Sequence, residues 1–100
     1  MTIIQTKENS ALIIALKGRL DTTTAPELER ALEESLVGVE RLTMDLKELE
    51  YLSSAGLRVL LTLQKKMNKQ GKMVVRNVSD TVLEVLRVTG FTEILTIVKK

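Results

Sequence analysis

The sequence predicts an α/β fold in which helices pack on a mixed, mainly parallel sheet. Three observations predict it. Strand-like apolar runs alternate with segments of helical periodicity from residue 24 onward, which indicates crossover units of a parallel sheet. Two strand-like runs precede them and favour an opening hairpin, which makes the sheet mixed. No Gly/Ser/Pro-rich linker interrupts the 100 residues, so we expect one domain over residues 1–100.

The opening hairpin is predicted from residues 3–7 and 11–17, two β-type runs separated by the polar turn of residues 8–10. The second run, ALIIALK, is rich in aliphatic and β-branched residues. Two such runs joined by a short polar turn are expected to pair antiparallel.

The first helix is predicted to begin at Thr24, because Thr24 and Glu27 fit a capping box and Pro26 is tolerated in a first helical turn. Gly38 is expected to end it in a left-handed conformation. Residues 41–46 then alternate between apolar and polar side chains, which predicts a strand.

The second crossover follows the same scheme. Residues 47–55 are predicted to be a loop, residues 56–70 an amphipathic helix, and Gly71 its end. Residues 72–76 form the next expected strand. The element order to this point is ββαβαβ.

The last crossover is predicted from a good N-cap, Ser79, followed by a helix through Val88 that Gly90 ends. Residues 94–98 are expected to be the final strand. The complete predicted order is therefore ββαβαβαβ.

Composition excludes several classes of function. The chain has no cysteine and no histidine, which removes thiolate metal sites, the commonest zinc ligand and the commonest general base. A net charge of +2, one Tyr and one Phe do not make a nucleic-acid surface. The longest apolar run, residues 11–16, is too short to span a bilayer, and no signal peptide is visible. We expect a cytoplasmic protein without cofactor, metal or membrane span.

Two loops follow predicted strands at the edge where α/β proteins gather their functional residues: residues 18–24 and residues 51–57. The second places two hydroxyls beside a helix N-terminus, which can hold a phosphate. A plain structural role remains open for each residue. Ser54 is also the type of residue that caps a helix N-terminus, and Gly56 the type that a tight turn requires. The threonines can serve simply to cap the first helix and to hydrogen-bond within their loop.

Two motifs give this chain a family resemblance. Residues 51–61, YLSSAGLRVLL, resemble the signature of the STAS family (sulfate transporter and anti-sigma factor antagonist), usually Asp-Ser-Ser/Thr-Gly-Leu after an aromatic–aliphatic pair. Residues 16–21, LKGRLD, are similar to the Gly-x-Leu/Ile-Asp motif that precedes the first helix in that family. The resemblance covers essentially the whole chain and implies a STAS-type α/β domain.

The resemblance implies a phospho-switch at Ser54, the serine that aligns with the family's phosphorylated residue. Ser53 stands where the family often has Asp, and Ala55 where it often has Ser or Thr. Ser53 is therefore a secondary candidate. In this family the partner is an anti-sigma factor that is itself a serine kinase, and a separate serine phosphatase resets the switch. An unphosphorylated antagonist binds the anti-sigma factor and frees the sigma factor.

The predicted partner-binding residues surround that serine in the two loops. For Asp21, a carboxylate hydrogen-bonded to its own loop is the alternative, and for Arg58 a solvated side chain. The full set comprises Asp21, Thr22, Thr23, Ser53, Ala55, Gly56, Leu57 and Arg58.

Three other functions are weighed against partner switching. A STAS regulatory subunit of a membrane transporter, or of another partner-switching complex, is the main alternative. A receiver-type phosphoacceptor needs an acidic cluster at a strand end, whereas Asp45 lies inside a predicted strand. No base is available to activate Ser54 as in a hydrolase, so we expect no catalytic activity.

Overall fold

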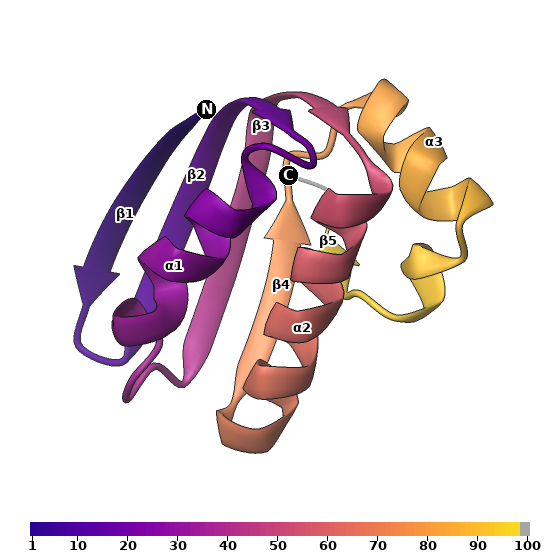
Figure 1. The fold of residues 1–100 in the computed structure, drawn as a ribbon. Helices are drawn as coiled ribbons and strands as arrows, with labels where there is room; N and C mark the ends of the chain where they lie inside the picture. The colour runs from indigo at the N-terminus through magenta and orange to yellow at the C-terminus, as the bar shows by residue number, and fades with distance from the viewer. Residues whose placement is uncertain (99–100) are drawn as a thin grey trace.

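The computed structural model describes residues 1–98, which form one five-stranded sheet with helices in the order ββαβαβαβ, as the sequence predicts (Figure 1). The strands lie side by side in chain order. The first two pair antiparallel and all later neighbours are parallel. The strands are β1 (Thr2–Glu8), β2 (Ala11–Leu20), β3 (Arg41–Leu52), β4 (Lys72–Arg76) and β5 (Ile97–Val98). The helices are α1 (Ala25–Ser35), α2 (Ser54–Gln70), α3 (Asp80–Val88) and the 3-10 turn η1 (Phe91–Glu93).

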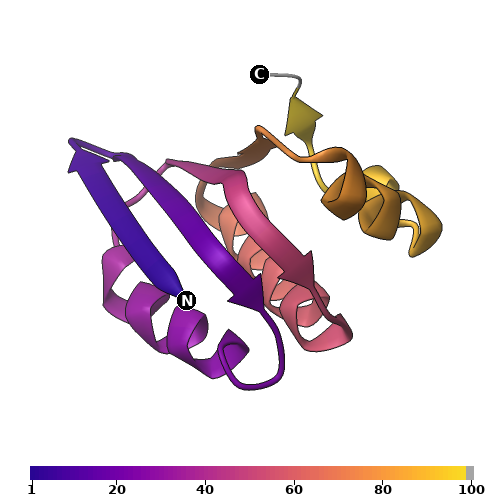
Figure 2. The same cartoon turned by 90° about the horizontal axis from the view of Figure 1, so that it is seen from above.

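Helices α1 and α2 cover the same face of the sheet (Figure 2). Both crossovers step one strand in the same direction, and right-handed connections of this kind place their helices on one face. Side chains alternate accordingly along β2: Leu12, Ile14 and Leu16 are buried, whereas Ile13 and Ala15 are half-buried on the opposite face. The core therefore lies between the sheet and these helices.

Strand β3 is longer than predicted, and the loop expected over residues 47–55 is wrong for its first six residues. The partners of Ala15 and Arg19 in β3 are Asp45 and Tyr51, so β3 advances six residues while β2 advances four. Two register shifts take up the difference. Such bulges break the period of two while the hydrogen-bonded ladder continues, which is why the alternation stops at Leu46 but the strand does not. β2 likewise reaches Leu20 instead of residue 17.

Helix boundaries shift by a few residues. α1 ends at Ser35, and Gly38 has a left-handed conformation (φ 79°) in the turn that follows rather than at the helix end. α2 begins at Ser54, two residues before the predicted start. These shifts matter for function because the start of α2 carries both candidate serines.

The last crossover confirms its predicted cap and corrects its predicted strand. The Ser79 hydroxyl accepts a hydrogen bond from the Val82 N–H (3.3 Å). The strand expected over residues 94–98 is reduced to β5, because Ile94 keeps a helical conformation after η1 and the neighbouring Leu95 is buried in the core.

Candidate functional site

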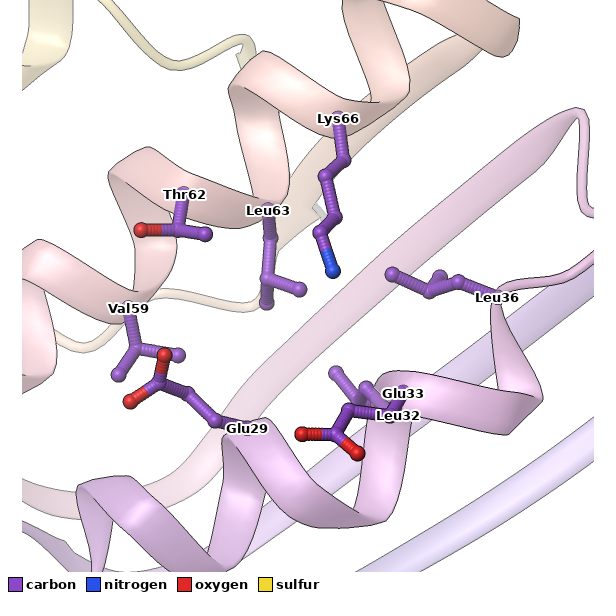
Figure 3. A pocket seen from close by; sticks show the side chains of 8 residues that line it. All are labelled: Glu29, Leu32, Glu33, Leu36, Val59, Thr62, Leu63 and Lys66. Atoms are coloured by element: carbon purple, nitrogen blue, oxygen red, sulfur yellow. The ribbon is translucent and has the colours of Figure 1, made fainter.

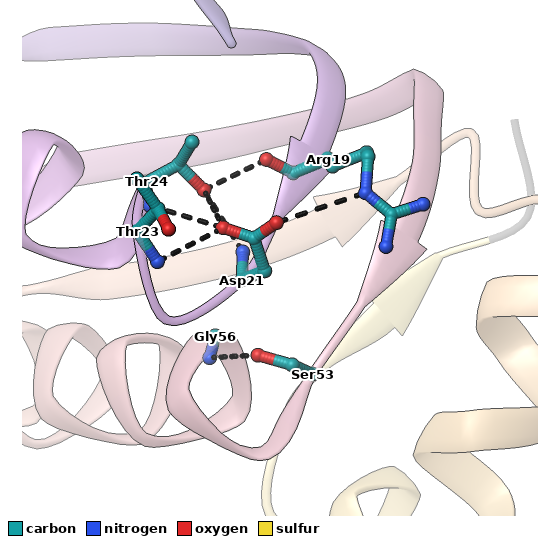
Figure 4. Close-up of polar contacts among 6 residues, drawn as sticks. All are labelled: Arg19, Asp21, Thr23, Thr24, Ser53 and Gly56. Atoms are coloured by element: carbon teal, nitrogen blue, oxygen red, sulfur yellow. Dashed lines mark hydrogen bonds and ion pairs between the residues drawn. The ribbon is translucent and has the colours of Figure 1, made fainter.

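The structure brings the two predicted loops together at the carboxyl ends of β2 and β3 (Figure 4). The Ser53 N–H donates to the Leu20 carbonyl (3.0 Å). Gly56 sits so close that a Cβ there would lie 2.7 Å from Leu52 Cδ1 and 2.9 Å from the Leu20 carbonyl oxygen. A residue without a side chain is therefore needed to bring the start of α2 against the end of β2.

Asp21 organises the turn that enters α1. Its Oδ1 accepts the N–H groups of Thr23 (3.0 Å) and Thr24 (3.1 Å). The Thr24 hydroxyl donates to the Arg19 carbonyl (2.7 Å) and accepts from the Asp21 N–H (2.8 Å). Thr24 makes no side-chain cap, so the predicted Thr24–Glu27 capping box is wrong. The reason is that the Thr24 hydroxyl is already engaged within the turn, whose own N–H groups Asp21 satisfies.

These contacts lower the pKa of Asp21 below its ordinary value of 3.8. The hydrogen bond from the Thr24 N–H is the largest cause, followed among the lowering contributions by the Thr23 N–H, the Thr24 hydroxyl and the Arg19 guanidinium. The Arg19 Nε lies 3.6 Å from Asp21 Oδ2. Each contact favours the charged carboxylate.

We predict that Asp21→Asn, which keeps the shape but removes the charge, lowers the free energy of unfolding at pH 7. A lowered folded-state pKa stabilises the fold above pH 3.8, and this contribution disappears as the pH falls through the folded-state pKa. Urea unfolding from neutral pH to about pH 2 should therefore show the gap between wild type and variant closing in acid. A gap that stays constant with pH would contradict the prediction.

The two candidate serines divide their roles. Ser53 is the N-cap of α2, in an extended conformation, and its Oγ accepts from the Gly56 N–H (3.4 Å). Ser54 is the first residue of the helix, and it is exposed. The alternative in which Ser54 serves as the N-cap is therefore wrong, because Ser53 occupies that position. The hydroxyl of Ser54 is left accessible at the positive end of the helix dipole.

We predict that Ser53→Ala lowers the free energy of unfolding by about 1 kcal/mol, since it removes the cap. The matched variant Ser54→Ala should change it by less than ~0.5 kcal/mol, as expected for an exposed position outside the cap. Urea unfolding of both variants checks this. A larger loss in Ser54→Ala than in Ser53→Ala would reverse the assignment of the cap.

The remaining predicted residues differ in accessibility. Thr22, Thr23 and Arg58 are exposed, so their side chains are available to a partner. Gly56 and Leu57 are buried. Gly56 and Leu57 can therefore affect binding only by positioning the first turn of α2. Ala55 is half-buried and packs against the core.

Sequence reasoning missed two residues of this site, Arg19 and Tyr51. The Arg19 guanidinium carbon lies 4.1 Å from the centroid of the Tyr51 ring, and the two residues are register partners in β2 and β3. Both residues lie within the two motifs that carry the family resemblance, and membership in those motifs is the sequence feature that could have identified them. Their stacking depends on the register after two bulges, which the sequence does not reveal.

A hollow between α1 and α2 is a less suitable site. Figure 3 shows Glu29 and Glu33 from α1 and Lys66 from α2 around it. Its volume of about 60 Å³ is at most that of a few water molecules. Leu32 and Leu63, which line it, belong to the core. The hollow is therefore a packing seam between two helices.

Asp45, the residue considered as a receiver-type acceptor, instead links β3 to Asn77, the residue that follows β4. Its Oδ1 accepts from the Asn77 Nδ2 and from the Lys47 N–H, each at 3.1 Å. It lies inside β3, as the sequence predicts. Within residues 1–98, no helix is long and apolar enough to cross a membrane.

Comparisons with known proteins agree with this geometry. The family model described as "STAS domain" matches residues 2–100. BtrV of Bordetella bronchiseptica, a candidate anti-sigma factor antagonist, is 35% identical over 96 residues, which cover 94% of this chain and 83% of that protein. The anti-sigma-B factor antagonist of Listeria monocytogenes is 31% identical over 97 residues, covering 94% and 84%.

Solved structures show the same fold. The unphosphorylated form of the anti-sigma factor antagonist SpoIIAA superposes with a TM-score of 0.87 at 16% identity, covering 99% of this chain and 88% of that one. The phosphorylated form of SpoIIAA, from Bacillus, has a TM-score of 0.78 at 16% identity, with coverages of 99% and 91%. At this identity the likeness concerns the fold alone.

Proposed function

The chain belongs to the STAS domain family, and from that premise we propose that it is an anti-sigma factor antagonist switched by phosphorylation of Ser54. Its relatives from Bordetella and Listeria are named as anti-sigma factor antagonists, which supports the antagonist part of the proposal. In its unphosphorylated form the chain binds an anti-sigma factor and so frees the sigma factor. The domain responsible is proposed to span residues 1–100.

The observation that supports Ser54 as the switch is that Ser53, and not Ser54, caps the helix, while Ser54 is exposed. Ser53 satisfies the helix N-terminus, so a kinase reaches the Ser54 hydroxyl without breaking a structural hydrogen bond. A phosphate on Ser54 lies next to the N–H groups and the positive dipole of a 17-residue helix, which favour an anion. The fold therefore tolerates the modification. Ser53 is half-buried and engaged, which makes it the secondary site.

The partners follow from this switch. The anti-sigma factor is proposed to be a serine kinase that supplies the nucleotide and the catalytic base, and a serine phosphatase resets Ser54. The chain itself is proposed to bind without catalysing a reaction, in the cytoplasm and without a cofactor. The exposed Thr22, Thr23 and Arg58 surround Ser54 in the proposed interface, together with Asp21.

The alternative of a transporter subunit is not favoured. The curated relatives that the chain matches over 94% of its length are named for anti-sigma factor antagonism.

The proposal is tested with tagged Ser54→Ala as bait in an extract of the source organism. We expect it to retain an anti-sigma factor, identified by mass spectrometry, that phosphorylates the wild-type chain on Ser54 when ATP is added. Ser53→Ala is the matched control and should still be phosphorylated. Recovery of no anti-sigma factor, or phosphorylation that persists in Ser54→Ala, would contradict the proposal.

A further inference from the structure

Arg19 and Tyr51 form a stacked and accessible pair at the carboxyl ends of β2 and β3, the strands that lead into the two loops of the proposed site. The Arg19 side chain is 60% exposed and Tyr51 is 42% exposed, although the guanidinium carbon lies only 4.1 Å from the ring centroid. Their neighbours Leu20 and Leu52 are buried, so alternation places the pair on the opposite side of the strands. The pair therefore continues the exposed surface from the Asp21 turn onto the sheet.

Two contacts constrain the guanidinium. Its carbon lies 4.1 Å from the centroid of the Tyr51 ring, and Nε lies 3.6 Å from Asp21 Oδ2. The Arg19 backbone is held as well, since its carbonyl accepts the Thr24 hydroxyl. The ion pair with Asp21 is made through Nε of Arg19, and Figure 4 shows the two terminal nitrogens of Arg19 pointing away from Asp21. These two nitrogens form a fork that matches a carboxylate.

We infer that Arg19, stacked on Tyr51, is the specificity-determining anchor that binds an acidic side chain of the anti-sigma factor. Arginine and tyrosine are the residue types that dominate binding energy in interfaces, above all where they are rigid before binding. The inference rests on the proposed function, which supplies the partner. It extends the interface beyond the serine loop to the end of β2.

Stability alone does not explain the pair. Exposed ion pairs and exposed cation–π contacts contribute little to folding, and both of these groups are exposed. Held in place but open to solvent, the guanidinium is suited to a contact that forms only in a complex. The phosphate of Ser54 is a second possible oxyanion for it, and the experiment separates the two sources by working without that phosphate.

The test measures binding of the retained anti-sigma factor by titration calorimetry, with every variant built on Ser54→Ala. Arg19→Glu should weaken binding by about thirtyfold or more, and Tyr51→Leu by about tenfold, as for anchor residues. Arg19→Lys should retain part of the affinity, because it keeps the charge but loses the planar fork. Arg41→Glu, a reversal of an exposed charge at the opposite end of β3, is the matched control and should stay within about twofold.

Thermal melts accompany the titrations and should be unchanged across the variants. An Arg19→Glu affinity within threefold of the Ser54→Ala parent, when that parent binds, would overturn this inference and leave the proposed function standing. A parent that binds no anti-sigma factor would overturn the proposed function and the inference together. A second pair of titrations compares Arg19→Glu with its parent in the chain that keeps Ser54, phosphorylated and unphosphorylated. An Arg19 effect seen only in the phosphorylated chain would assign the guanidinium to the phosphate and would overturn the inference.

Discussion

Phosphorylation of Ser54 is expected to lower the affinity for the anti-sigma factor about a thousandfold and to leave the fold intact. The phosphate adds a charge of about −1.5 to −2 near neutral pH. In the free chain this charge faces water and the N-terminus of α2, which favours an anion by up to ~2 kcal/mol. Ser54 is exposed there, so the free domain loses nothing on modification.

The complex responds differently because the same charge must lose its water. Burying an imperfectly paired charge in an interface costs several kcal/mol. A loss of about 4 kcal/mol of binding free energy is therefore expected when Ser54 is phosphorylated. Each ~1.4 kcal/mol is a factor of ten, which gives the thousandfold loss. The switch is then electrostatic and local, and requires no rearrangement of the sheet or helices.

Titration calorimetry against the anti-sigma factor checks this, with wild type, phosphorylated chain, Ser54→Ala and Ser54→Asp compared. Ser54→Ala should bind and stay bound when ATP is added. Ser54→Asp should bind weakly, although one carboxylate is a poorer mimic than a phosphate. Equal affinity of the phosphorylated and unphosphorylated chains would refute the mechanism, and a collapse of the melting temperature on phosphorylation would show that the switch works by unfolding.

The second large effect is expected from Gly71→Ala, which should lower the free energy of unfolding by about 3 kcal/mol or more. A Cβ on Gly71 would lie 1.9 Å from the Glu40 carbonyl oxygen and 2.6 Å from its carbon. That carbonyl cannot move away cheaply, because it accepts the Lys72 N–H (2.9 Å) at the start of β4. The clash is with backbone, so no side-chain rotation relieves it.

Gly38→Ala is the matched control for this glycine. Nothing lies within 4 Å of a Cβ at Gly38, and only its left-handed backbone (φ 79°) opposes the substitution. That strain costs about 1–2 kcal/mol. Urea unfolding of the two variants should therefore rank Gly71→Ala as the more destabilised, and a smaller loss at Gly71 than at Gly38 would contradict the close approach of Glu40.

The start of α2 shows which features can be predicted from neighbouring residues and which depend on the packing of distant segments. Two adjacent hydroxyls before a helix are visible in the sequence, and so is the family motif that contains them. Which of the two caps the helix is decided by where β3 ends, since Ser53 is anchored to the Leu20 carbonyl and takes the cap position. That end point lies beyond two bulges, and the sequence-based boundary was accordingly two residues late.

The order of elements, the α/β class, the family and the position of the candidate switch, Ser54, can all be predicted from the amino-acid sequence. These follow from periodicity and short motifs, which are local properties of the chain. Three features become visible only in the folded chain: Ser53 caps α2, Gly71 passes close to the Glu40 carbonyl, and Arg19 stacks on Tyr51. The physical reason is common to all three. Each depends on which backbone atoms of distant segments meet, and that is set by strand register and packing between elements rather than by any run of neighbouring residues.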